Sequence, residues 1–341
     1  MLFFLNSIHW WRMFILSGLV WMLFGCGDNA VQQFSFTGPT MGTTYSIKGL
    51  GANVDATELQ SQVDNRLVEL NMIFSTYVAD SEISKINANS NEEQRISKNM
   101  EEVLVISQEI YEISSGAFDV TVDPLVNLWG FGSDGPVDGV PDDNVIEDVM
   151  NQIGFHQLVI ENGQLRRPPS VSIDLSAVAK GYAVDEIAAL LESSGLENYL
   201  VEIGGEVKTS GKNSLASDWV IGIEAPDREV RSLYRTLPVF DLALATSGDY
   251  RNFFDYQGVI YSHTIDPRTG WPVEHNLVSV TVLHESAAMA DALATAFIVL
   301  GAEETMRIAE EENFLVFAIL REKDNFEERL SEALVNYLDR R

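Results

Sequence analysis

The sequence predicts one integrated α+β domain in which mixed sheets pack against helices. Helical and strand patterns are interspersed along the chain without the regular strand-helix-strand alternation that indicates a parallel sheet. Residues 130–143, rich in Gly, Pro and Asp, are the only loop-like stretch long enough to mark a domain boundary. Because helical and strand signals resume on both sides, we interpret this stretch as a long functional loop within one domain.

Four helices are expected from apolar spacing and end signals. Asp55 and Glu58 resemble a capping box, and apolar residues follow at helical spacing at positions 59, 63, 67 and 70. A second amphipathic helix is expected over residues 99–114, where Gly116 ends it. A third is expected over residues 176–192, and a long apolar helix over residues 285–300.

Short apolar runs predict the strands. A turn-rich segment, residues 37–42, precedes the first of them. Strands are expected over residues 43–48, 171–175, 199–203, 219–224, 240–244 and 314–320.

The charge of the chain limits its partners. The 341 residues include 51 Asp plus Glu and 22 Lys plus Arg, a formal net charge of −29. Because proteins bind nucleic acids through Lys and Arg, nucleic acid is not an expected partner. A phosphate ligand would instead need backbone amides, a helix N-terminus or a divalent cation held by carboxylates.

The N-terminal segment has the layout of a secretory signal. Residues 1–25 hold one charged residue, Arg12, before an apolar run too short to span a bilayer. Cys26, the only cysteine, follows in a sequence that looks like a bacterial lipobox. We expect a lipoprotein signal peptide over 1–25, a lipidated tether over 26–33 and the folded domain over 34–341. An uncleaved anchor with an ordinary thiol at Cys26 is the alternative, and both interpretations place the domain outside the cytoplasm.

Two segments offer backbone donors at the end of an expected strand. Asp174 and Ser176 stand at the predicted strand-to-helix turn of residues 171–192, and Lys180 follows about one turn later. A capped helix with a solvated lysine explains this segment equally well. Gly204 and Gly205 permit close approach of a ligand to the backbone, although a plain turn is the more common explanation.

Two further segments carry side chains that are candidates for catalysis or metal binding. His263 lies among polar and turn-forming residues, where it is a candidate base or a structural hydrogen-bonding group. Asp291 and Thr295 are four residues apart on an otherwise apolar helix and share one face. A carboxylate in that setting needs a hydrogen-bonded neighbour or a hard cation such as Mg²⁺ or Ca²⁺.

Taken together and in order, these segments resemble the ApbE family, flavin transferases that use FAD to attach FMN to proteins. The resemblance runs from about residue 36 to residue 301. The main matching segments are TMGTTY at 40–45, FSTY at 74–77, GAFDVT at 116–121, IDLSAVAKGY at 173–182, GG at 204–205, HTIDPRTG at 263–270 and ADALAT at 290–295.

The resemblance implies a role for each matching position. His263 matches the proposed catalytic base, and lipidation of Cys26 agrees with a family that includes many lipoproteins. The Mg²⁺ ligands would be the carbonyl of Ala177 with Asp291 and Thr295. The FAD contacts would be Met41, Tyr77, Ala117, Phe118, Asp119, Asp174, Lys180 and Ile265.

Three functions remain open from the sequence. The favoured one is Mg²⁺-dependent transfer of FMN from FAD to a threonine of a membrane flavoprotein, with release of AMP. By resemblance, acceptors would be subunits of the Na⁺-translocating NADH:quinone reductase or of Rnf-type complexes. The alternatives are a periplasmic FAD pyrophosphatase and a non-catalytic FAD-binding lipoprotein. We expect the protein on the periplasmic face of the cell envelope, anchored by its lipid to the inner or outer membrane.

Overall fold

The computed structural model describes residues 31–340, except residues 133, 134, 138, 228, 229, 231, 250–252 and 324. The predicted signal peptide and Cys26 lie outside the described residues. Within the described part of the chain, no helix is long and apolar enough to cross a membrane. The first strand begins at Gln32, so the last two residues of the predicted tether belong to the sheet.

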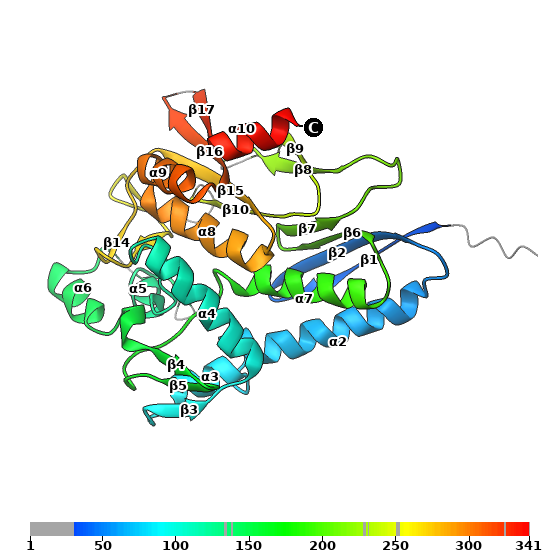
Figure 1. Cartoon of the computed structure of the whole chain (residues 1–341). Coiled ribbons are helices and arrows are strands. Elements are labelled where there is room, and N and C mark those ends of the chain that lie inside the picture. Colours follow the sequence, from blue (N-terminus) through cyan, green and yellow to red (C-terminus); the bar gives the residue numbers. More distant parts are fainter. Residues whose placement is uncertain are drawn as a thin grey trace, which may run out of the picture.

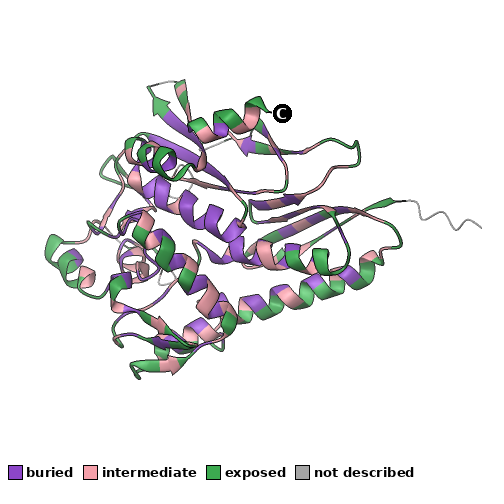
Figure 2. Ribbon diagram, viewed as in Figure 1, coloured by how far each residue is buried: buried purple, intermediate pink, exposed green. Residues whose placement is uncertain are grey.

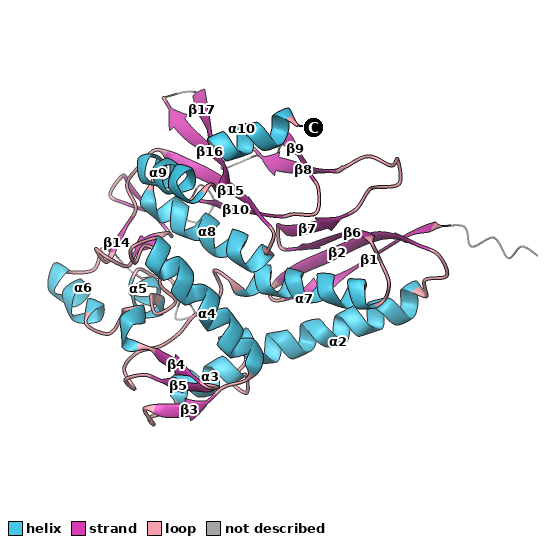
Figure 3. Cartoon of the chain, viewed as in Figure 1, coloured by secondary structure: helices cyan, strands magenta, loops and turns pink. Residues whose placement is uncertain are grey.

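An eight-stranded sheet organises the fold and confirms the predicted single α+β domain (Figures 1 and 3). The strand order is β1-β2-β6-β7-β10-β15-β16-β17, and every neighbouring pair is antiparallel. The strands are β1 (Gln32–Thr40), β2 (Thr43–Gly51), β6 (Asn198–Ile203), β7 (Glu206–Ser210), β10 (Ala243–Gly248), β15 (Leu277–His284), β16 (Leu315–Glu322) and β17 (Asn325–Leu330).

Helices cover one face of this sheet, with α8 (Ala287–Leu300) at the centre (Figure 1). Figure 2 shows α8 buried along almost its entire length, as its apolar sequence requires. The surrounding helices are α2 (Ala56–Phe74), α4 (Lys98–Ile113), α7 (Ala179–Ser193) and α9 (Ala302–Glu312). Val316 and Ala318 of β16 face this core, because alternate residues of a strand point to one side of a sheet.

The intervening residues of β16, Phe317 and Ile319, face a second core on the opposite side of the sheet. There they pack with Leu334 of α10 (Glu332–Asp339) and with the hairpin of β8 (Trp219–Glu224) and β9 (Leu233–Val239). Residues 302–340 therefore supply an interior strand and part of both cores. The sequence alone left the role of this segment open.

A third cluster surrounds Trp129, whose indole Nε1 donates to the carbonyl of Gly270 at 2.9 Å. The elements around it are α5 (Asp123–Leu128), α6 (Asp143–Met150), β11 (Phe253–Tyr256), β12 (Val259–Ser262), β13 (Ile265–Asp266) and β14 (Trp271–Pro272). The described residues of the predicted loop 130–143 connect α5 to α6 as expected. The remaining elements are α3 (Glu82–Ala88), β3 (Glu93–Arg95), a 3₁₀ turn (Phe155–Gln157), β4 (Val159–Glu161) and β5 (Gln164–Arg166).

Local signals predicted two helix ends correctly, the start of α2 and the end of α8. The Asp55 carboxylate accepts from the amides of Thr57 and Glu58 at the start of α2, which confirms the cap. The Glu58 side chain accepts from Gln62, so only the Asp55 half of the capping box is formed. Gly301 ends α8 with a positive φ of 77°, a conformation that glycine adopts at little cost.

Two of the segment predictions near the site were wrong. Residues 37–40 continue strand β1 and pair with β2, leaving a turn at Met41 and Gly42. Residues 171–175 form no strand, because their backbone groups do not bond to a neighbouring strand: Ile173 N donates to the side chain of Asn87 in α3, and Asp174 N to the Val120 carbonyl.

The start of α7 also differs from the prediction. Ser176 is not its cap, since the helix begins at Ala179 after a turn at residues 176–178. The Asp174 carboxylate stabilises that turn by accepting from the Ser176 amide at 2.7 Å.

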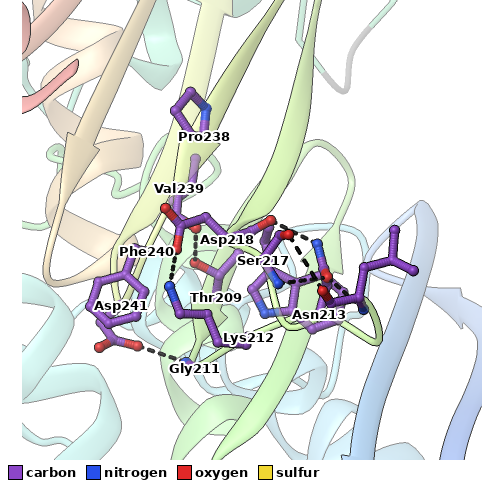
Figure 4. Close-up of polar contacts among 12 residues, drawn as sticks. Thr209, Gly211, Lys212, Asn213, Ser217, Asp218, Pro238, Val239, Phe240 and Asp241 are labelled. Carbon is purple, nitrogen blue, oxygen red and sulfur yellow. Dashed lines mark hydrogen bonds and ion pairs between the residues drawn. The ribbon is translucent and has the colours of Figure 1, made fainter. Parts of the chain in front are cut away.

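The strand predicted over 240–244 is displaced to β10, residues 243–248. Figure 4 shows the polar contacts that hold the intervening chain in a turn. Asp241, with a φ of 49°, accepts from the Gly211 amide. The Thr209 hydroxyl donates to the carbonyls of Val239 and Leu242. These bonds connect the end of β9 to β7 and reverse the chain before β10 begins.

Helix α7 passes close to the start of α8 at Gly181. A Cβ on Gly181 would lie 2.3 Å from the Ala287 carbonyl oxygen. Replacement of a helical glycine by alanine ordinarily stabilises a protein by about 0.5–1 kcal/mol. Here we expect Gly181→Ala to destabilise the protein by about 1–3 kcal/mol, because overpacking must push the helices apart. Urea unfolding measures the change, and equal or increased stability would contradict the close crossing.

Candidate functional site

A cavity of about 820 Å³ lies where α7, α8, β10 and the segment of residues 263–267 meet. Eleven of the twelve residues predicted to bind FAD or Mg²⁺ or to act as base line it. They are Tyr77, Ala117, Phe118, Asp119, Asp174, Ala177, Lys180, His263, Ile265, Asp291 and Thr295. Met41 is the exception: it sits on the β1–β2 turn, partly buried against the first core.

A cluster of three charges, two buried carboxylates and a partly exposed lysine, forms one wall of the cavity. The Lys180 ammonium lies 2.9 Å from Glu206 Oε1 and 3.6 Å from Asp291 Oδ2. Asp291 Oδ2 also accepts from the Gly181 amide at 3.0 Å. The sequence prediction that Asp291 needs a partner is therefore confirmed, and Lys180 is part of an ion pair instead of a solvated surface lysine.

Burial shapes the pKa values of this cluster. Burial tends to lower the pKa of Lys180, but Asp291 and Glu206 outweigh it, so the pKa is raised above its ordinary value. Burial raises the pKa of Asp291, and Lys180 and the Gly181 amide act in the opposite direction. Burial and the charge of Asp291 raise the pKa of Glu206 to about 7, against the effect of Lys180. The cluster thus holds one firmly protonated lysine between two carboxyl groups that resist ionisation.

Thr295 lies one turn beyond Asp291 on α8, as the spacing predicted. Its hydroxyl is 3.3 Å from that of Ser247, near the end of β10. Ala177 lines the same cavity from the turn before α7. The cavity wall therefore offers the Asp291 carboxylate and the Thr295 hydroxyl from α8, the Ser247 hydroxyl from β10, and a backbone segment from the turn before α7.

The segment 117–119 is held in place by the Asp119 carboxylate. Its Oδ1 accepts from the amide and the hydroxyl of Thr121, at 2.8 and 2.6 Å, and its Oδ2 from the Phe155 amide at 2.9 Å. Burial raises the pKa of this carboxyl, and these hydrogen bonds oppose the shift. Asp119 lines the cavity, but its charge is used chiefly to fix the backbone around it.

His263 follows directly after β12 and stands on the cavity wall. The ring of Phe131, from the start of the long loop, contacts its imidazole edge to face with 6.2 Å between ring centroids. Tyr77 is 82% exposed at another part of the lining, an unusual position for an aromatic ring in a folded domain. The cavity thus combines a histidine, an accessible aromatic face and a buried charge cluster.

The donor set fits a hard cation. Among the described residues there is no group of three or more His, Cys, Asp or Glu that could hold an ion by itself. Mg²⁺ commonly takes one or two protein carboxylates and completes its coordination with water and substrate phosphate. The Asp291 carboxylate, the Thr295 hydroxyl and the Ala177 carbonyl have that chemistry.

Sequence reasoning assigned no role to several lining residues, chiefly Glu206, Ser247 and Phe131. Glu206 directly follows Gly204 and Gly205, which form the β6–β7 hairpin turn with φ values of 62° and 111°. The glycine pair was noticed, but the side chain after it was not. The orientation of Glu206 toward Lys180 depends on the packing of β7 against α7, which the local sequence does not contain.

Comparisons with known proteins agree on one family. The sequence profile described as "ApbE family" matches residues 41–319. The chain is 42% identical over 323 residues to a protein of Vibrio cholerae named FAD:protein FMN transferase, covering 94% of this chain and 96% of that protein. An Escherichia coli protein of the same name is 35% identical over 318 residues, covering 91% and 90%.

Solved structures give the same answer. The flavin transferase ApbE from Vibrio cholerae superposes with a TM-score of 0.83 at 40% identity, covering 90% of this chain and 99% of that one. The apo form of the Pseudomonas stutzeri flavinyl transferase ApbE gives a TM-score of 0.83 at 35% identity, covering 90% and 97%.

Removal of the Asp119 carboxylate should destabilise the fold measurably. Asp119→Ala leaves the buried amides of Thr121 and Phe155 without an acceptor, and we expect a loss of roughly 3 kcal/mol in the free energy of unfolding. Asp174→Ala serves as the control, because that carboxylate makes a single bond, to Ser176, and we expect a loss below about 1 kcal/mol. Equal losses for the two variants, measured by urea unfolding, would contradict the anchoring role of Asp119.

Proposed function

This chain belongs to the ApbE family, and on that premise we propose that it transfers FMN from FAD to a threonine hydroxyl of an acceptor protein, releasing AMP. One observation carries the proposal. A single cavity gathers His263, Lys180 and Asp291 from three separate segments of the chain. The relatives named FAD:protein FMN transferase support the same reaction.

The cavity suits a flavin nucleotide. Its volume of about 820 Å³ lies in the range of small-molecule sites, roughly 300–1,000 Å³. Tyr77 and Phe118 offer aromatic surface to a flavin or adenine ring, and Lys180 is a cation on the wall of an otherwise acidic protein. We propose that the FAD pyrophosphate lies on the side of Lys180 and Asp291.

We assign Asp291, Thr295 and the carbonyl of Ala177 to a Mg²⁺ ion. When bound, the ion would neutralise charge on the pyrophosphate and stabilise the leaving phosphate of AMP. Such an ion would explain how a chain with a net charge of −29 binds the negatively charged pyrophosphate of FAD. The protein supplies the oxygen ligands, and the phosphates complete the site.

In the proposed reaction His263 accepts the proton of the acceptor threonine. The threonine oxygen then forms a bond to the FMN-side phosphorus, and the bond between that phosphorus and the bridging oxygen breaks. The bridging oxygen leaves with its electron pair on AMP. The products are FMN linked to the protein by a phosphoester, and AMP.

Two alternative functions would use the same cavity. With water in place of threonine, the reaction becomes hydrolysis of FAD to free FMN and AMP. A protein that only stores FAD would need neither a base nor a metal site, and the cavity lining includes His263 together with the proposed Mg²⁺ ligands. The names of the relatives favour transfer to protein over both alternatives.

We further propose that the protein acts at the periplasmic face of the cell envelope, held by a lipid on Cys26 to the inner or outer membrane. The support is the signal-like pattern of residues 1–26. Acceptors in that place would be membrane flavoproteins, such as subunits of the Na⁺-translocating NADH:quinone reductase or of Rnf-type complexes.

Replacement of His263 separates binding from chemistry. We expect His263→Ala to bind FAD as the wild type does but to transfer FMN about 10²- to 10⁴-fold more slowly, since it lacks the general base. The assay incubates protein, FAD, Mg²⁺ and a threonine-bearing acceptor, then compares the fluorescent protein band with free FMN. Free FMN without a labelled band would favour hydrolysis, neither product would favour storage, and unchanged transfer by the variant would remove His263 from its role.

Replacement of Asp291 tests the metal site. We expect Asp291→Ala to lose transfer and any response of the residual rate to Mg²⁺, because the only carboxylate of the proposed ligand set is gone. Ser247→Ala is the control: it removes a hydrogen bond to Thr295 and should keep the Mg²⁺ requirement. Rates measured against Mg²⁺ concentration and in EDTA test both, and full activity of Asp291→Ala in EDTA would refute the metal assignment.

A further inference from the structure

Glu206 is a buried carboxylate in the site that the proposed mechanism does not use. Its side chain is 6% exposed, and it lines the cavity at the start of β7. Oε1 accepts from Lys180, whereas Oε2 is fully buried and has no hydrogen-bond partner among the described residues. A carboxylate oxygen in that state is costly, because burial removes its water and nothing replaces it.

The charges around Lys180 do not balance. Two carboxylates, Glu206 and Asp291, share one ammonium at 2.9 and 3.6 Å. With both ionised, the cluster carries one excess negative charge, and burial makes such an excess unfavourable. The excess calls for a positive group in the cavity beside this wall.

A neighbouring ion pair shows that the α7–β7 packing does not itself require an unpartnered oxygen. Lys208, two residues after Glu206 on β7, lies 2.7 Å from Asp185 of α7. The other oxygen of Asp185 accepts from the Ser286 hydroxyl and the Ala288 amide. The same two elements therefore hold a fully partnered carboxylate at one point and an incompletely partnered one at the cavity.

We propose that Glu206 is a positioning residue of the cation site, strengthening the binding of a divalent cation at Asp291. This rests on the proposed function, which places Mg²⁺ there. Lys180 lies between the two carboxylates, so the charge of Glu206 offsets that of the ammonium and leaves the negative charge of Asp291 available to the cation. Lys180 connects Glu206 to Asp291, so the two carboxylates act as one unit toward the cation.

The alternative is that Glu206 is only the counter-ion of Lys180. Glu206→Gln separates the two roles, because glutamine keeps the shape and an oxygen for Lys180 but loses the negative charge. Asp185→Asn is the matched control: it removes a carboxylate from a lysine pair between the same two elements, outside the cavity lining.

The test is a calorimetric titration of the full chain with Mg²⁺ without FAD, accompanied by thermal unfolding. We expect Glu206→Gln to weaken Mg²⁺ binding about 10-fold or more, the usual effect of losing a partner of the first ligands, and Asp185→Asn to bind as the wild type does. FAD affinity in EDTA should change little in Glu206→Gln. If that variant does not fold, Glu206→Asp, which keeps the charge but shortens the reach, should show the same direction of change.

Mg²⁺ affinity of Glu206→Gln within twofold of the wild type would overturn the proposal and leave the counter-ion role. An equal loss in Asp185→Asn would overturn it as well, because Mg²⁺ binding would then depend on the total negative charge near α7 and not on Glu206 in particular. A wild-type chain that binds no Mg²⁺ would also refute it. Failure of the proposed function is seen separately, as a wild-type protein that binds Mg²⁺ and FAD but forms no labelled acceptor.

Discussion

The burial of Asp291 is the constraint on which the site depends. It is the single charged residue of α8, a helix whose other positions fill the main core. A lone ionised carboxylate there would be strongly unfavourable, so other elements must approach it. Gly181 lets α7 come close enough for its amide to reach Asp291, and the same helix delivers Lys180. The part of the cavity wall that holds Lys180 and Asp291 is therefore formed by the packing of α7 on α8.

The same constraint explains how an acidic chain can bind a nucleotide. Most of its carboxylates are on the surface and solvated, where they contribute little to local binding energies. Asp291 and Glu206 are different, because burial raises their pKa values and makes the space beside them favourable for a cation. Lys180 supplies one positive charge, but it is shared by two carboxylates and does not neutralise both. A net negative charge on the protein and a phosphate ligand are thus compatible, provided that the local site supplies positive charge.

The features that sequence predicted best are those set by neighbours in the chain. The cap at Asp55, the end of α8 at Gly301 and the shared face of Asp291 and Thr295 all depend on residues within one or two turns. The segment 171–175 was mistaken for a strand because its apolar alternation is real, since its buried residues do enter the core. No local pattern shows that the backbone amides of this segment donate to the Asn87 side chain and the Val120 carbonyl. Glu206 was missed for the same reason.

The irregular chain before α7 is nevertheless firmly held. Asn87 makes two bonds with Ile173, donating to its carbonyl and accepting from its amide, as a neighbouring strand would. The buried guanidinium of Arg167 donates to carbonyls that include those of Ile86 and Val171, joining the same two segments. Side chains therefore replace the missing sheet partner. A strand would have to continue its ladder, whereas this arrangement lets Asp174 and the turn after it face the cavity. The departure from regular structure is therefore what places Asp174 and Ala177 in the cavity lining.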